Sequence, residues 1–164
     1  MTRVYLDHNA TAILRPEARA AMIAAMEVCG NPSSVHAEGR AAKALVEKAR
    51  AQVAAAFGAD GADIVFTSGS TAGASLALAD RGLHGAPVEH DAVRAWTVED
   101  LAVSPEGAVQ IADPVRSTVQ LANSETGIVQ RLPEGLAVTD ATQAFGKMPV
   151  AVHWVGARMG LGSA

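Results

Sequence analysis

Short apolar segments, each followed at once by small polar or charged residues, are the feature that most constrains the fold of this chain. Four such segments lie at residues 63–67, 86–89, 118–122 and 136–139. Runs of this length bounded by turn-forming residues are typical of short buried strands. In a parallel sheet the carboxyl ends of the strands line a ligand crevice, and the polar residues would lie there. The pattern predicts an α/β fold with a binding site at one edge of its sheet.

Helical segments precede and separate these apolar runs. Pro16-Glu17 suits the first turn of a helix that we expect to reach about Cys29, where residues 30–32 stop it. A second helix is expected from residue 35 or 36 to residue 57, with one apolar stripe. An alanine-rich helix should follow the polar residues 68–71 and end near Asp80. This alternation of helices and strands favours an α/β sheet.

Other strand candidates are weaker. Residues 4–6 read as the end of a strand, and residues 148–152 and 159–163 as two further strands. The connection over residues 123–135 contains Pro133 and two glycines and has no room for a crossover helix. It is therefore either a bare loop or a link between strands that are not parallel neighbours.

Composition excludes several classes of protein. The formal net charge of -4 argues against a strongly basic nucleic-acid binder, and no apolar run approaches the length of a membrane span. Cys29 is the one cysteine, so an internal disulfide framework and a cysteine-based zinc site are excluded. The histidines show no metal-ligand spacing, and no metal is expected. We expect a cytoplasmic protein.

Residues 68–71 (Ser-Gly-Ser-Thr) place hydroxyl groups before a helix. Backbone N–H groups and the positive end of the helix dipole there favour an anion such as a phosphate. The lysine of a nucleotide-binding Walker loop is missing, so nucleoside triphosphate binding is not supported. The alternative is an ordinary serine or threonine N-cap.

Asp140 and His90 each have two interpretations. Asp140 either caps a helix that starts at Ala141 or places a carboxylate beside a buried cationic group. His90 is either an ordinary loop histidine or an aromatic ring that lies against a planar ligand.

Taken in order, these segments resemble the cysteine desulfurases, which belong to the class-V aminotransferase group of pyridoxal-phosphate enzymes. No single segment is specific, but their order and combination are. The matching segments are YLDHNAT near the start, GNPSSVH at 30–36, DIVFTSGST at 63–71, EHDAV at 89–93, ANSETGIVQ at 122–130 and TDATQAFGK at 139–147.

The resemblance implies a pyridoxal 5'-phosphate site built from residues of this chain. It assigns His90 to stacking on the pyridine ring and Asp140 to the ring nitrogen, which makes these two the catalytic candidates. An anion beside that nitrogen keeps it protonated, and the protonated ring is an electron sink. The cofactor-binding set that the resemblance implies is Ser70, Thr71, His90, Asn123, Ser124, Asp140, Gln143 and Ser163.

The resemblance also implies residues that this sequence does not contain. The Schiff-base lysine of the family would follow Ser163-Ala164, and the nucleophilic cysteine would lie on a later loop. Residues 1–164 would then form an N-terminal segment and most of the cofactor-binding large domain, without the C-terminal small domain. We expect this chain to be inactive by itself. Cys29 is expected to be a buried, inert cysteine within the first helix.

The implied activity is removal of sulfur from L-cysteine, giving alanine and an enzyme persulfide for sulfur transfer or iron–sulfur cluster assembly. The implied fold is a mostly parallel sheet with helices on both faces, in a homodimer, with a possible sulfur-acceptor protein as partner. Neither nucleic acid nor a membrane is expected as a partner.

Several positions depart from the family pattern. Ala72, Ala74 and Ser75 replace a glutamate and two asparagines, and Ser124 stands where the family has an asparagine. These departures leave two possibilities for the substrate, cysteine or another compound. The alternatives are another class-V enzyme, such as a selenocysteine lyase, and a non-catalytic scaffold or binding protein with this fold.

Overall fold

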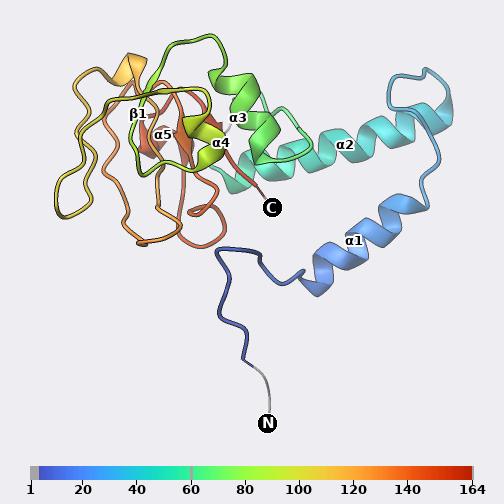
Figure 1. The fold of residues 1–164 in the computed structure, drawn as a ribbon. Coiled ribbons are helices and arrows are strands. Elements are labelled where there is room, and N and C mark those ends of the chain that lie inside the picture. The colour runs from blue at the N-terminus through green and yellow to red at the C-terminus, as the bar shows by residue number, and fades with distance from the viewer. Residues whose placement is uncertain (1–3, 60, 164) are drawn as a thin grey trace. The chain divides into compact units, whose positions relative to one another are not determined.

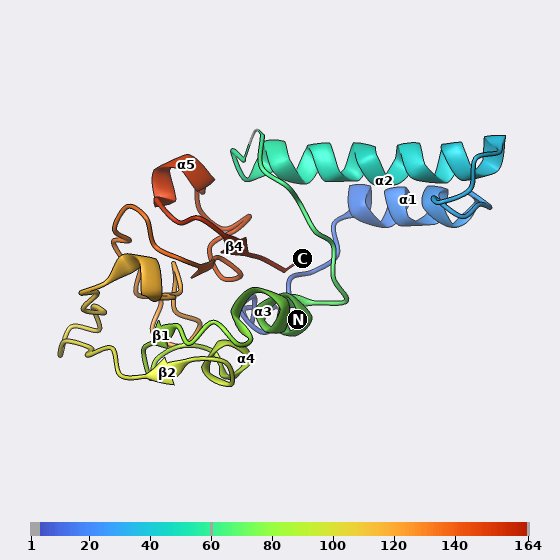
Figure 2. The same cartoon turned by 90° about the horizontal axis from the view of Figure 1, so that it is seen from above.

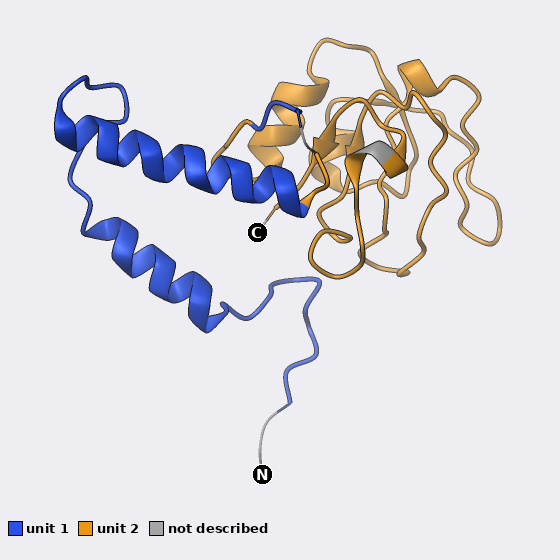
Figure 3. Cartoon of the chain, turned by 180° about the vertical axis from the view of Figure 1, so that it is seen from behind, with its two compact units in different colours: residues 1–56, 60–64 blue, residues 57–59, 65–164 orange. Residues whose placement is uncertain are grey.

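The computed structural model describes residues 4–59 and 61–163. The chain divides into two compact units, one of residues 1–56 and 60–64 and the other of residues 57–59 and 65–164 (Figure 3). All residues that the sequence nominates for the cofactor site belong to the second unit.

The first unit contains two helices, α1 (Pro16–Met26) and α2 (Ala37–Ala56). Proline at the start of α1 and Glu17 in its first turn confirm the expected helix start. The helix ends at Met26, three residues before the expected end at Cys29, and the chain turns there toward residues 30–32. Cys29 therefore lies after α1 and is exposed, so the expectation of a buried cysteine within the helix is wrong.

The turn between α1 and α2 explains part of the GNPSS segment in physical terms. The side chain of Asn31 accepts a hydrogen bond from the Ser33 N–H at 2.9 Å, and its backbone carbonyl accepts one from the Ser34 N–H at 2.9 Å. A Cβ atom at Gly39 would collide with the backbone carbonyl of Ser34. Close approach of α2 to this turn thus requires glycine at position 39.

Replacing Gly39 by alanine is expected to destabilise the protein by about 1–3 kcal/mol, because backbone atoms must move to admit the methyl group. Urea unfolding of the intact protein, followed by circular dichroism, measures the change. Gly160→Ala is the matched control, because a Cβ there meets nothing within 4 Å and its φ is not in the left-handed region. Equal stability of the two variants would contradict the close approach.

The second unit combines short helices with short strands (Figures 1 and 2). In chain order they are α3 (Ser70–Leu78), β1 (His84–Gly85), α4 (Asp91–Arg94), β2 (Val98–Glu99), the 3-10 turn η1 (Pro114–Arg116), β3 (Thr139–Asp140), α5 (Val152–Val155) and β4 (Gly160–Leu161).

The strands of this unit form a parallel ladder. β1 pairs with β2 and β3 with β4, both in parallel. Parallel bridges join His84 to Ser117 and Thr118 to Val138, so the segment at residues 117–121 lies between β1 and β3. The hydrogen-bonding order is therefore β2, β1, residues 117–121, β3, β4. This arrangement confirms the predicted α/β class with parallel pairing.

The connection over residues 123–135 is the bare loop that the sequence left as one option. It joins the parallel neighbours around Thr118 and Val138 without a helix. A turn at its start, closed by the Gly127 N–H donating to the Asn123 carbonyl at 3.0 Å, begins the return of the chain. Gly127 has a φ of +71°, which glycine adopts without strain.

Several expected strands are shorter than predicted or absent. Residues 63–67 are not a strand, and Val65 and Phe66 are 74% and 49% exposed. Residues 4–6 and 148–152 likewise form no strand, and residues 86–89 form a turn after β1. The physical reason is that a strand needs a ladder of backbone hydrogen bonds to a second segment, and no described segment forms such a ladder with these residues. The candidate at residues 159–163 is confirmed in part by β4.

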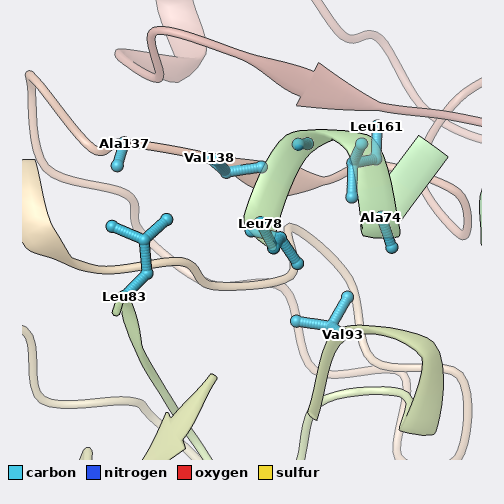
Figure 4. Packing of buried hydrophobic residues seen from close by; sticks show 8 residues of the cluster. Ala74, Leu78, Leu83, Val93, Ala137, Val138 and Leu161 are labelled. Atoms are coloured by element: carbon cyan, nitrogen blue, oxygen red, sulfur yellow. The ribbon is translucent and has the colours of Figure 1, made fainter. Parts of the chain in front are cut away.

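Two small apolar clusters hold the second unit together. The larger one joins α3 and α4 to the ladder (Figure 4). A Cβ added at Gly73 would lie 3.8 Å from the Leu161 side chain, so the first turns of α3 pack directly on β4. The larger cluster consists of Ala74, Ala77, Leu78, Leu83, Val93, Ala137, Val138 and Leu161. The smaller is built on Leu121, Ala122 and Ala144.

Within the described part of the chain, no helix has the length and apolar character needed to cross a membrane.

Candidate functional site

The residues nominated from the sequence follow the carboxyl ends of the parallel segments. His90 comes shortly after β1, Asn123 two residues after the segment at 117–121, and Asp140 ends β3. Ser163 follows β4. Because the paired segments run in the same direction, these ends belong to one edge of the ladder. The structure thus brings residues far apart in sequence to a common edge.

Ser70 and Thr71 form the first turn of α3, next to that edge. The N-cap of α3 is Gly69, which has no side chain to form a capping hydrogen bond. The hydroxyls of Ser70 and Thr71 therefore do not act as an ordinary N-cap. The Thr67 hydroxyl donates to the Gly69 carbonyl at 2.8 Å and orders the approach to the helix. Ser70 is half-buried and Thr71 is exposed. The first N–H groups of a helix have no partner within it, so this turn offers donors to an anion.

His90 is the N-cap of α4. Its Nδ1 atom accepts a hydrogen bond from the Ala92 N–H at 3.1 Å, and the side chain is otherwise exposed. An accepting Nδ1 places the proton of the neutral imidazole on Nε2. The ring therefore has a defined orientation at its base and an exposed surface.

Asp140 is half-buried at the end of β3. Its Oδ1 atom accepts from the Thr142 N–H at 2.9 Å, and its backbone carbonyl accepts from the Leu121 N–H at 2.8 Å. No helix begins at Ala141; the following residues form turns. The carboxylate orders this turn, and the helix-capping interpretation does not hold.

The other nominated residues differ in how the protein uses them. Asn123 is buried: its Oδ1 atom accepts from the N–H groups of Glu125 and Thr126 at 2.9 and 2.8 Å, and its Nδ2 donates to the Val88 carbonyl at 3.0 Å. The Ser124 hydroxyl lies 3.2 Å from a Glu125 carboxylate oxygen. The remaining two are Gln143, whose side-chain oxygen accepts from Lys147 Nζ, and Ser163, which is exposed.

Glu89 was missed by the sequence reasoning. The residue is only 5% exposed, and both carboxyl oxygens accept from the Gln120 N–H, at 2.9 and 3.1 Å. Burial raises the pKa of Glu89 to about 8, against the lowering effect of the Gln120 hydrogen bond and with a further increase from the charge of Asp140. The signal in the sequence was a glutamate at the end of an apolar segment, directly before His90.

Among residues 4–59 and 61–163, no group of three or more histidine, cysteine, aspartate or glutamate side chains is arranged to hold a metal ion.

Residues 4–104 match the family model described as aminotransferase class-V. The chain belongs to the class-V aminotransferase family. Pyridoxal phosphate is the cofactor of this family, and the resemblance that the sequence motifs indicated is confirmed.

Individual relatives and solved structures show which class-V aminotransferases this chain is similar to. It is 38% identical to a cysteine desulfurase of Cereibacter sphaeroides, over 93% of this chain and 49% of that protein. It is 32% identical to a selenocysteine lyase of Bos taurus, over 94% of this chain and 50% of the relative. The crystal structure of a NifS-like protein from Rickettsia africae matches with a TM-score of 0.81 and 28% identity, over 98% of this chain and 53% of that one.

These likenesses confirm the fold-type-I α/β architecture of pyridoxal-phosphate enzymes for this class-V aminotransferase. The chain spans about half the length of the curated relatives that it matches.

Proposed function

We propose that this chain supplies most of the pyridoxal-phosphate site of a cysteine-desulfurase-like enzyme. The observation that carries the proposal is the gathering of the first turn of α3, His90, Asp140 and Ser163 at the carboxyl edge of one parallel ladder. Similarity to cysteine desulfurases over nearly the whole chain supports the same function.

The side chains at this edge fit the chemistry of the cofactor. A phosphate would be held by the N–H groups of the first turn of α3 together with the hydroxyls of Ser70, Thr71 and Ser163. A second observation is the buried Thr142 hydroxyl, which has no hydrogen-bond partner among the described residues and follows Asp140 by two positions. A polar ligand beside Asp140 would supply that partner.

The cofactor, when bound, supplies an electron sink for the carbanion of an amino-acid substrate. Asp140 would accept a hydrogen bond from the protonated ring nitrogen and hold that proton in place. Its orientation comes from the Thr142 N–H, which occupies Oδ1. His90 would lie against the ring and exclude water from one side, and Asn123, Ser124 and Gln143 are proposed to contact the ring substituents.

The proposed reaction takes sulfur from L-cysteine and leaves alanine, with a sulfur-acceptor protein as the eventual recipient, in a homodimeric cytoplasmic enzyme. The Schiff-base lysine and the persulfide-forming cysteine are proposed to lie outside residues 1–164. Similarity to selenocysteine lyases keeps selenocysteine as the second candidate substrate. Release of alanine from cysteine by the intact protein, measured against release from selenocysteine, separates the two.

Cofactor binding tests the proposal most directly. The intact protein is titrated with pyridoxal phosphate, and binding is followed by the visible absorption of the bound cofactor. We expect saturable uptake; a protein that folds but takes up no cofactor would overturn the function.

Removing both hydroxyls from the first turn of α3, by Ser70→Ala with Thr71→Val, is expected to weaken this binding about 10- to 100-fold. The reason is the loss of hydrogen bonds to a doubly charged phosphate. Ser104→Ala, which removes a hydroxyl from a turn remote from α3 in sequence, is the control and should bind as the unaltered protein does. An unchanged affinity in the double variant would remove this turn from the phosphate site.

A further inference from the structure

Three hydrogen bonds tie the residues just before His90 to the segment that leads toward the site edge. The Glu89 carboxyl accepts from the Gln120 N–H, the Gln120 side chain donates to the Val88 carbonyl at 2.6 Å, and the Asn123 side chain donates to the same carbonyl at 3.0 Å. Glu89, Gln120 and Asn123 are all buried. We call these three hydrogen bonds the 88–123 tether.

The tether connects the two catalytic candidates. At one end His90 follows Glu89 directly, and its ring is held as the N-cap of α4. At the other end, the Leu121 N–H donates to the Asp140 carbonyl at 2.8 Å, so the segment at 117–121 is also the neighbour of β3. The backbone of His90 and that of Asp140 are thus joined through Glu89, Gln120 and Leu121.

We propose that Glu89 is a positioning residue of the cofactor site, whose buried carboxyl group holds the His90 backbone in register with Asp140. This inference rests on the proposed function, because the positions of His90 and Asp140 matter only if both side chains contact the cofactor ring. The carboxyl group acts through His90 and need not touch the ligand.

The environment of Glu89 fits a neutral hydrogen-bonding group better than a charge. Burial and the negative charge of Asp140 both raise its pKa, while His90 and Asp91 follow it along the chain. A protonated carboxyl still accepts from the Gln120 N–H through its carbonyl oxygen. Glutamine reproduces this neutral form, whereas alanine leaves the Gln120 N–H buried without its acceptor.

The first measurement follows the His90 ring in the intact protein without cofactor. Nuclear magnetic resonance of labelled histidine gives one set of ring signals for His90 and another for His84, whose Nδ1 lies 2.8 Å from Asp100; His90→Gln and His84→Gln assign them. We expect Glu89→Ala to shift or broaden the His90 signal and to leave that of His84 in place. Glu89→Gln should preserve both.

The second measurement is pyridoxal-phosphate affinity. Glu89→Ala is expected to weaken binding about tenfold, the effect of losing one buried hydrogen bond, with Glu89→Gln close to the unaltered protein. If Glu89→Ala does not fold, Glu89→Asp, which shortens the side chain and withdraws the carboxyl group from the Gln120 N–H, should shift the His90 signal. Glu134→Gln, at an exposed glutamate, is the control.

The outcomes separate this inference from the proposed function. A protein that takes up no cofactor overturns the function, while the His90 signal still tests the tether. An unmoved His90 signal in Glu89→Ala or Glu89→Asp, or equal movement of the His84 and His90 signals, overturns the positioning role. Failure of Glu89→Gln to rescue His90 overturns it as well.

Discussion

Replacing Asp140 by alanine is expected to abolish measurable turnover of the intact enzyme while leaving its fold. The carboxylate is the group proposed to keep the ring nitrogen protonated, and without it the ring loses most of its capacity as an electron sink. Asp140→Asn is the sharper variant, because an amide oxygen can still accept from the Thr142 N–H and preserve the turn. For this variant we expect turnover to fall about 10²- to 10⁴-fold.

Alanine production from cysteine at saturating pyridoxal phosphate measures this effect, and circular dichroism checks the fold. Asp113→Asn is the matched control: Asp113 is exposed, and its side chain makes no capping hydrogen bond to η1. It should retain full activity. Activity of Asp140→Asn equal to that of the control would remove Asp140 from the mechanism.

The stability of the protein is expected to depend on pH through Glu89. Its pKa is raised from 4.5 to about 8 in the folded state, so between these values the folded chain holds a proton that the unfolded chain releases. The protonated Glu89 therefore contributes its full share to the free energy of unfolding below about pH 4.5, and this contribution is lost as the pH rises toward 8. The loss reaches at most about 1.4 kcal/mol per pH unit within this window.

Glu89→Gln is expected to remove this slope, because glutamine does not titrate. Relative to the unaltered protein, the variant should become progressively more stable from pH 5 to pH 8, by a few kcal/mol in total. Urea unfolding at a series of pH values measures the difference, and Glu134→Gln, at an exposed site, should leave the slope unchanged. Parallel stability curves for Glu89→Gln and the unaltered protein would show that Glu89 does not carry a shifted pKa.

The helices could be predicted because their signals are local. Proline and glutamate at the start of α1 and the glycine at its expected end lie within a few residues of the elements that they shape. Even here the end of α1 was misplaced by three residues, since the turn that starts before Gly30 depends on packing against Gly39 of the next helix. The exposed position of Cys29 follows from this shift.

The strands could be predicted only as candidates. Residues 63–67 have the apolar character of a strand but pair with no described segment, whereas residues 117–121 lie between two partners and are buried. Pairing is a relation between distant segments, and hydrophobicity along one segment does not record it.

The sequence by itself determined the α/β class, the three main helices and the polar residues placed after apolar segments, including His90 and Asp140. These follow from local chemistry and from the order of the motifs, which also indicated the family. Only the tertiary structure decided which strands exist, that residues 123–135 form a bare loop between parallel neighbours, and that Glu89 is buried against Gln120. The raised pKa and the tether of Glu89 arise from groups that are 31 residues or more away along the chain, and they act only once folding has removed water from between them.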